Sequence, residues 1–295
     1  MSECSSIIGE VDLVICLDSG AGNYDQFWTT VSLRGMISCN LKVQVLNEGV
    51  HSGSSSGVVP SSFRLIRQLI SRIENEETGE ILLPELSCEV PEFRLIEAQK
   101  MAENLNGNAE SFPWHKTTSS MAQTTVDGLL GRTWKPTLSI VGAGGLPSIE
   151  NGGNVLRPYT ELKLSFRLPP TVDSKRAMNA VSKILTDDPP NNASVTVDWD
   201  EPANGWSAPK LSDWLEGTIN DASQLFYDRP AMAMGEGATI PFMAMLGEQF
   251  PSAQFVITGV LGPESNAHGP NEFLHIPFAK RLSACVAYIL ERYPS

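Results

Sequence analysis

Three side chains that could take part in metal chemistry stand in loops directly after apolar segments. Asp18 follows VDLVICL (11–17), Glu236 follows AMAM (231–234), and His268 follows FVIT (255–258). In open α/β sheets, ligands bind beyond the carboxyl ends of the strands. Asp, Glu and His also provide the oxygen and nitrogen atoms that coordinate zinc. The sequence therefore predicts a site where these loops meet.

Each of these residues also has a purely structural explanation. Asp18 could cap the next segment, GEGATI (235–240) could be a simple turn, and His268 could be a surface histidine. GEGATI is not a phosphate-binding loop, because the Gly-Lys-Ser/Thr of that motif is absent. The functional interpretation depends on all three residues occurring at equivalent strand ends.

Bulk properties exclude several classes of protein. The net charge of −13 over 295 residues disfavours nucleic acid as a partner. No apolar run approaches the ~20 residues of a membrane span, and the start, MSECSSIIGEVDL, lacks the features of a signal peptide. The five cysteines are odd in number and show no paired spacing. We therefore expect a reduced, cytosolic protein without a membrane segment.

The elements that must position these residues form an interrupted α/β pattern. Between residues 37 and 199 the periodicity predicts β-α-β-β-α-β, the ferredoxin-like arrangement. Its expected elements are strands at 40–47, 136–142, 161–168 and 194–199 and helices within 59–75 and 174–185. Phe63, Ile66, Ile70 and Ile73 form the expected apolar stripe of the first helix.

The remaining segments complete this pattern. Residues 76–136 read as a mixed helix and loop excursion, with Trp114 and Trp134 as packing anchors. The apolar strands described above lie on both sides of the inserted module, together with helices expected at 211–226 and 277–293. Strand-loop-helix units therefore flank an inserted α+β module.

Six motifs carry a resemblance to a known family. They are CLDSG (16–20), SLRG (32–35), EGVHSG (48–53), SFRLPP (165–170), GEGATIP (235–241) and ESNAHGPNE (264–272). With them the chain resembles the dinuclear-zinc peptidase family of aminoacylases, carboxypeptidases and carnosinases, closest to its cytosolic nonspecific dipeptidase branch. The resemblance implies a zinc-peptidase α/β domain, here partial (1–29 and 205–295), interrupted by a ferredoxin-like lid and dimerisation domain (30–204).

The resemblance also implies roles for individual residues. Asp18 would bind one zinc ion and His268 the other, with two zinc ions per complete subunit and manganese as the alternative metal. His51 would reach the active site of the partner subunit in a homodimer and polarise the scissile carbonyl of a dipeptide or N-acyl amino acid. The substrate-binding residues would be Arg167 for the terminal carboxylate, Glu236, Gly237 and Thr239 for the backbone, and Asn154 where relatives carry threonine.

The sequence also departs from the family pattern. The family's His-x-Asp motif, bridging aspartate and Glu-Glu pair have no counterpart before Asp18, so we expect the chain to correspond to the C-terminal part of such an enzyme. Three interpretations follow. The chain is part of a dizinc exopeptidase, a non-catalytic short form that dimerises through its lid and regulates a full-length partner, or a binding module that uses no metal.

Overall fold

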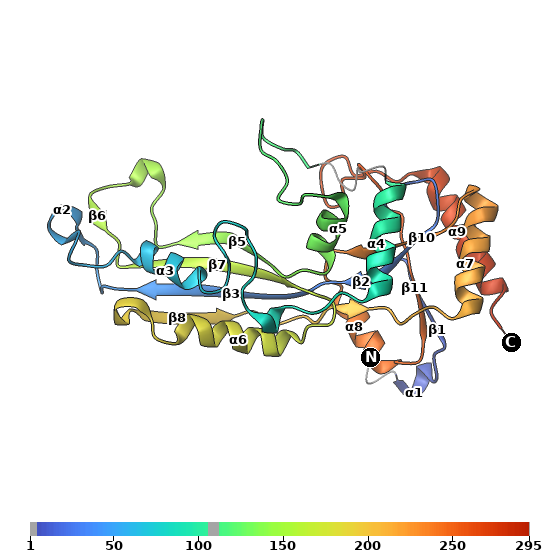
Figure 1. Cartoon of the computed structure of the whole chain (residues 1–295), viewed down its shortest axis with the longest axis horizontal. Coiled ribbons are helices and arrows are strands. Elements are labelled where there is room, and N and C mark those ends of the chain that lie inside the picture. The colour runs from blue at the N-terminus through green and yellow to red at the C-terminus, as the bar shows by residue number, and fades with distance from the viewer. Residues whose placement is uncertain (1–4, 106–111, 295) are drawn as a thin grey trace. The chain divides into compact units, whose positions relative to one another are not determined.

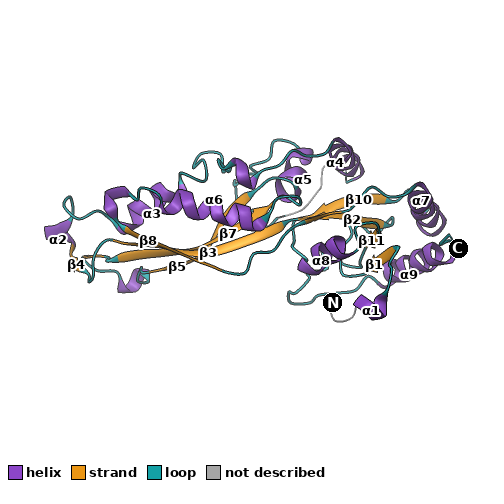
Figure 2. Cartoon of the chain, turned by 90° about the horizontal axis from the view of Figure 1, so that it is seen from below, coloured by secondary structure: helices purple, strands orange, loops and turns teal. Residues whose placement is uncertain are grey.

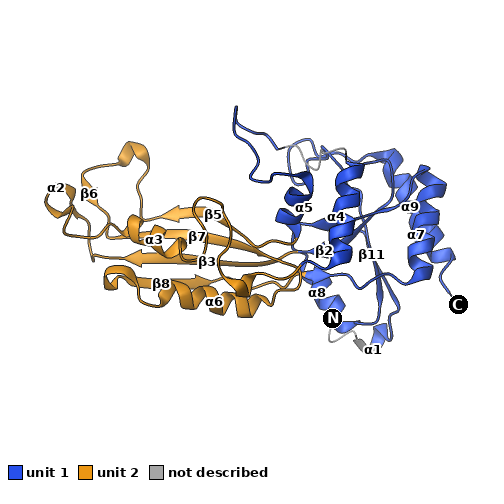
Figure 3. Ribbon diagram, viewed as in Figure 1, with its two compact units in different colours: residues 1–33, 90–133, 206–295 blue, residues 34–89, 134–205 orange. Residues whose placement is uncertain are grey.

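The computed structural model describes residues 5–105 and 112–294 (Figure 1). The chain forms two compact units, and each is assembled from separated segments (Figure 3). Unit 1 comprises residues 1–33, 90–133 and 206–295, and unit 2 comprises residues 34–89 and 134–205. Both units mix helices with strands, which confirms the predicted α/β class.

Unit 2 is built on an antiparallel sheet with the strand order β5-β7-β3-β8. Helices α3 and α6 lie on one face of this sheet (Figure 2). The chain order is β-α-β-β-α-β, so the predicted ferredoxin-like arrangement is confirmed. The elements are β3 (Gly35–Gln44), α3 (Ser62–Ile70), β5 (Thr137–Gly144), β7 (Tyr159–Leu168), α6 (Ser174–Thr186) and β8 (Ser194–Trp199).

Alternating side chains explain why this sheet has one buried and one polar face. Along β7 every second residue is buried, including Leu164 and Phe166. On α3 the predicted stripe is only partly right. Ile66 is fully buried, but Phe63 is 43% exposed, and Leu65 and Leu69 take the inward positions instead. The helical period accommodates either face, and packing against the sheet selects the leucine face.

Shorter elements complete unit 2. They are β4 (Val50–His51), α2 (Ser52–Ser55), β6 (Val155–Leu156) and the 3-10 helices η2 (Pro84–Leu86), η3 (Ile149–Asn151) and η4 (Pro190–Asn192).

Unit 1 contains two groups of strands. β1 (Leu13–Cys16) pairs in parallel with β11 (Gln254–Ile257). β2 (Trp28–Leu33) lies between β10 (Met232–Glu236), which is parallel to it, and β9 (Trp206–Ser207), which is antiparallel. The helices are α1 (Ser5–Ile8), α4 (Glu92–Asn104), α5 (Thr125–Thr133), α7 (Asp213–Tyr227), α8 (Pro241–Gln249) and α9 (Ile276–Glu291).

The segment 90–133 packs with unit 1, which differs from the predicted lid of 30–204. Met101 of α4 and Leu129 of α5 belong to the same buried cluster as Phe27 and Trp28. The predicted anchor Trp114 is half exposed, so that prediction was wrong, whereas Trp134 is buried. Burial of Met101 and Leu129, rather than of Trp114, therefore fixes this excursion to unit 1.

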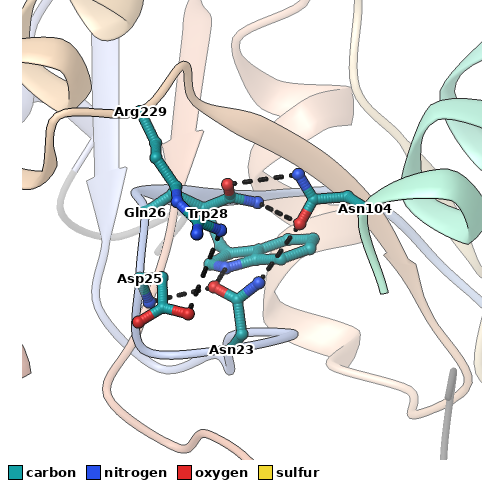
Figure 4. Close-up of polar contacts among 6 residues, drawn as sticks. All are labelled: Asn23, Asp25, Gln26, Trp28, Asn104 and Arg229. Carbon is teal, nitrogen blue, oxygen red and sulfur yellow. Dashed lines mark hydrogen bonds and ion pairs between the residues drawn. The ribbon is translucent and has the colours of Figure 1, made fainter. Parts of the chain in front are cut away.

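A polar cluster in unit 1 also ties α4 to the loop before β2 (Figure 4). Gln26 is fully buried and exchanges two hydrogen bonds with the side chain of Asn104, at 3.1 and 3.3 Å. Asn23 donates to the same Asn104 oxygen and accepts a hydrogen bond from the Trp28 indole. Because buried amides are costly unless paired, this cluster holds the C-terminus of α4 in a defined place.

No helix within residues 5–105 and 112–294 has the length and hydropathy of a membrane-spanning segment. The four cysteines in the described ranges, Cys16, Cys39, Cys88 and Cys285, are free thiols.

Candidate functional site

The Asp18 loop is held between β2 and the loop that follows β11. Asp18 is exposed, but its neighbour Ser19 is buried and its hydroxyl lies 2.5 Å from the hydroxyl of Thr30 on β2. The backbone N–H of Ala21 donates to the carbonyl of Leu261 at 2.8 Å. The ends of β1 and β11 are thus joined, and Asp18 stands at the carboxyl end of a parallel strand pair, where ligands of α/β sheets bind.

The loop that carries His268 has an unusual backbone. Four residues within it adopt positive φ although none is glycine: Glu264, Asn266, His268 and Asn271. Such conformations are uncommon and cluster at functional sites. The exposed His268 is held through its backbone N–H, which donates to the Glu272 carboxylate at 3.2 Å. The exposed His268 side chain is therefore attached to a loop whose backbone conformation is defined by these positive φ angles and this hydrogen bond.

Glu236 ends β10 and lies beside the Asp18 loop. A Cβ atom on Gly20 would be 3.4 Å from Oε1 of Glu236. Glu236 is half-buried, and burial raises the pKa of its carboxyl while the charge of Arg132 opposes that shift. Burial likewise lowers the pKa of Arg132, and Glu236 opposes it. The pair thus places a partly desolvated carboxylate next to the strand end that carries Asp18.

The predicted metal ligands do not form a complete site among the described residues. Within 5–105 and 112–294 no group of three or more His, Cys, Asp or Glu side chains is close enough to hold a metal ion. Stable zinc sites use three or four protein ligands. The residues present therefore do not by themselves fit a zinc pair, and the roles of Asp18 and His268 as ligands stay predictions.

His51 and Asn154 come together in unit 2. β4 pairs with β6, so that His51 is opposite Val155, and the Ser52 N–H donates to the Asn154 carbonyl at 2.9 Å. The Gly/Ser-rich loop after His51 is a helical turn, α2, which His51 caps: its Nδ1 accepts from the N–H of Gly53 at 3.1 Å. The exposed imidazole is thereby fixed in orientation.

Arg167 lies on β7 in unit 2. Its directly opposite neighbours are Met36 on β3 and Thr137 on β5, so these side chains share one face of the sheet. That face is the one away from the buried cluster around Phe166 and Leu164. This is the placement that the alternating pattern of SFRL predicts. Gly237 and Thr239, in the loop after β10, lie in unit 1 with Glu236.

A cavity of about 750 Å³ in unit 1 does not coincide with any predicted site residue. It lies among α4, α7, β2 and β10, and its wall includes Arg94, which is 4% exposed. Arg94 donates to Glu97 at 2.7 Å and to the Ala208 carbonyl at 2.9 Å. Large pockets are the usual first hypothesis for a ligand site, but the strand-end chemistry lies elsewhere.

Arg132 and Glu272 are the charged groups that sequence reasoning missed. Glu272 stands inside the ESNAHGPNE motif, four residues after His268. Arg132 belongs to the irregular segment 76–136, where no periodic pattern indicates which residue faces the site. Its contact with Glu236 depends on the packing of α5 against β10, where Thr133 lies next to Gly235.

Comparison with known proteins gives one family. The model of the M20 peptidase dimerisation domain matches residues 31–193. A cysteinylglycine-S-conjugate dipeptidase of Corynebacterium striatum is 23% identical over 274 residues, which cover 85% of this chain and 55% of that enzyme.

Solved structures share the fold. The di-peptidase Dug1p of Saccharomyces cerevisiae aligns with a TM-score of 0.74 and 20% identity over 99% of this chain and 61% of its own. Human carnosine dipeptidase 1 aligns with a TM-score of 0.70 and 18% identity, and the alignment covers 95% of this chain and 59% of that enzyme. The M20 family metallo-carboxypeptidase Sso-CP2 of Sulfolobus solfataricus aligns with a TM-score of 0.71 and 17% identity, and the alignment covers 93% of this chain and 62% of that enzyme. The chain thus spans less than two thirds of each of these relatives.

Proposed function

Because this chain belongs to the M20 peptidase family, we propose that it is part of a zinc-dependent exopeptidase that hydrolyses dipeptides or N-acyl amino acids. The observation that carries the proposal is the family match over residues 31–193. The Corynebacterium striatum relative is named for a dipeptide conjugate, and a dipeptide is the substrate class we assign here. Membership of the peptidase family does not depend on which substrate the complete protein hydrolyses.

Asp18 and His268 are the proposed metal ligands of unit 1. A bound zinc pair would activate a water molecule and polarise the scissile carbonyl. Two ligands are too few to hold two ions, so we infer that further ligands come from additional polypeptide. The length of the relatives agrees with this inference, since the chain spans 55% of the bacterial dipeptidase.

His51 is the proposed donor to the substrate carbonyl. Its Nδ1 accepts the Gly53 N–H, which fixes the proton of the neutral imidazole on Nε2. A neutral histidine in this tautomer donates from Nε2, as polarisation of a carbonyl requires. Oxyanion contacts of this kind contribute ~3–4 kcal/mol in well-studied enzymes. We propose that this donor acts on the active site of the partner subunit in a homodimer formed through the dimerisation domain.

Each unit, taken by itself, carries proposed substrate-binding residues. In unit 2, the guanidinium of Arg167 suits a terminal carboxylate, and Asn154 adjoins His51 through the β4–β6 pair. In unit 1, the loop of Glu236, Gly237 and Thr239 would contact the substrate backbone. We also propose that the reaction takes place in the cytosol.

Dipeptide hydrolysis by the complete protein in which residues 1–295 occur tests this function. We expect hydrolysis that EDTA abolishes and zinc or manganese restores. Asp18→Asn and His268→Ala should each lower kcat/KM by about 100-fold or more, the loss typical of a disabled catalytic centre. Arg64→Gln, on the exposed side of α3, is the matched control and should keep full activity. Hydrolysis that persists undiminished in EDTA would contradict the proposal.

A further inference from the structure

The cavity of about 750 Å³ in unit 1 touches two of its buried apolar clusters. Ile219 of α7 belongs to one cluster, and Val31 of β2 and Phe255 of β11 belong to the other. Met232 of β10 and Ile96 of α4 line the cavity as well. Pockets that bind small molecules usually have volumes of ~300–1,000 Å³ and mainly apolar walls. The cavity therefore has the size and the lining of a small-molecule site.

One buried polar group in this wall lacks a partner. Arg94 is 4% exposed, and its two terminal nitrogens donate to Glu97 at 2.7 Å and to the Ala208 carbonyl at 2.9 Å. Its Nε is buried and makes no hydrogen bond to any residue within 5–105 and 112–294. A buried donor without an acceptor costs free energy, so this exception requires an explanation. An acceptor on a molecule in the cavity would supply the missing partner.

The charges around the cavity indicate which kind of acceptor fits. The Arg94 guanidinium already forms an ion pair with Glu97. A carboxylate at Nε would bring a second negative charge close to that of Glu97 in a desolvated place, where like charges repel strongly. The lining as a whole has no excess of either charge, because its ionisable side chains are three cations and three anions: Arg94, Lys100, Lys210, Glu97, Glu103 and Glu216. A neutral oxygen, such as that of an amide, avoids the repulsion.

We propose that this cavity binds a neutral, mainly apolar small molecule whose amide carbonyl accepts a hydrogen bond from Nε of Arg94. The apolar part of the ligand packs against Val31, Ile219 and Met232, and Glu97 holds the guanidinium in place. Arg94 makes the site selective for a neutral acceptor over an anion. This site does not depend on the proposed function, since none of the residues assigned to metal or substrate lines the cavity.

Methyl NMR of the full chain, labelled with ¹³C at the methionine methyl groups, tests the proposal. The two probes, 4-methylbenzamide and 4-methylbenzoate, have nearly the same shape but differ in charge. We expect 4-methylbenzamide to shift the Met232 signal saturably with a Kd in the millimolar range, while the signal of Met36 in unit 2 stays unchanged. The affinity for 4-methylbenzoate should be lower by about tenfold or more, because of its charge.

Substitution of Arg94 tests the role of its Nε. Arg94→Lys keeps a cation beside Glu97 but removes the Nε–H donor, so the affinity for 4-methylbenzamide should fall by about tenfold. Arg64→Lys, the same exchange on the exposed side of α3, is the matched control and should leave the affinity unchanged. If Arg94→Lys does not fold, Ala233→Leu decides, because Ala233 lines the cavity and the larger side chain should weaken binding of the amide.

Three results would overturn the proposal. They are a Met232 signal that shows no saturable shift, equal affinity of wild type for the amide and the carboxylate, and an unchanged amide affinity in a folded Arg94→Lys or Ala233→Leu variant. The first result would mean that water alone satisfies Nε of Arg94. Circular dichroism checks that each variant is folded. Because no step measures hydrolysis, these outcomes are separate from those that test the proposed peptidase function.

Discussion

Gly259 is the position where the structure makes its sharpest prediction. This residue follows β11, and a Cβ atom there would lie 1.6 Å from the Ser19 carbonyl oxygen, 2.3 Å from its carbonyl carbon and 2.6 Å from its nitrogen. All three atoms belong to the backbone, so no rotamer change relieves the clash. Gly259→Ala must therefore push the end of β11 away from the loop that carries Asp18.

The size of the effect follows from that geometry. To bring the new methyl to an ordinary contact, Ser19 has to move by more than about 1.4 Å, in a loop fixed by its buried hydroxyl pair with Thr30. Overpacking of a well-packed interior costs ~1–3 kcal/mol. A backbone obstacle belongs at the upper end, so we expect Gly259→Ala to lower the free energy of unfolding by about 3 kcal/mol.

Gly217→Ala is the matched control. Gly217 lies within α7, and nothing comes within 4 Å of the Cβ that alanine adds. The same chemical change should there raise the free energy of unfolding by ~0.5–1 kcal/mol, because alanine is the better helix former. Urea unfolding followed by far-UV circular dichroism measures both. Equal stability of the two variants would refute the reasoning that the Ser19 backbone approaches Gly259 too closely for any larger residue.

Four further predictions address the site and the units. In the complete enzyme, His51→Ala and Asp18→Asn homodimers should each be nearly inactive, and co-refolded mixtures should regain up to about half of wild-type activity per mixed dimer if His51 acts in trans. Mixed dimers as inactive as the parents would exclude that arrangement. Met101→Ala should destabilise unit 1 by ~2–5 kcal/mol, because the side chain is 4% exposed; unchanged unfolding would mean that α4 does not belong to that core. Burial raises the pKa of the Cys39 and Cys285 thiols to about 12 from 9.0. Between about pH 9 and pH 12 these thiols ionise in the unfolded chain but stay protonated in the folded one, so their ionisation lowers the free energy of unfolding over that range and leaves it unchanged below about pH 9. The melting temperature of a Cys39→Ala/Cys285→Ala variant should therefore fall less steeply with pH over that range than the melting temperature of the wild type. Finally, residues 1–295 alone should retain no stoichiometric zinc after dialysis, and elemental analysis showing two ions per chain would contradict this.

Sequence patterns were sufficient wherever one periodicity dominated. The strict alternation of ELKLSFRL predicted β7 with its buried and polar faces, including the side of the sheet on which Arg167 lies. Apolar runs predicted β1, β10 and β11. In β7 and β11 local pattern and tertiary burial agree, so the sequence alone determined the assignment, whereas β1 forms where predicted although each of its residues is only half-buried.

The pattern was insufficient where burial does not follow hydrophobicity. All six residues of β2 are buried, but Thr29, Thr30 and Ser32 interrupt its apolar character, and this strand was not predicted. The pairing of the Thr30 and Ser19 hydroxyls offsets part of the polar burial. Likewise, the attachment of α4 to unit 1 includes hydrogen bonds between the buried Gln26 amide and the half-buried Asn104 amide. Neither contact has a local signature in sequence, since its partners are far apart along the chain.

The state of unit 1 bears on whether the chain acts alone. Parallel strands are normally buried on both faces, yet every residue of β1 is only half-buried and the adjoining Leu17 is 58% exposed. The two predicted metal ligands, Asp18 and His268, are exposed as well. A dizinc centre needs more protein ligands than these two. The half-buried strand β1, the exposure of Asp18 and His268, and the greater length of the relatives are separate observations, and all three support the proposal that additional polypeptide completes the catalytic site. In the proposed enzyme His51 would add a donor from a partner subunit, so we expect assays of residues 1–295 in isolation to detect binding of substrate rather than its hydrolysis.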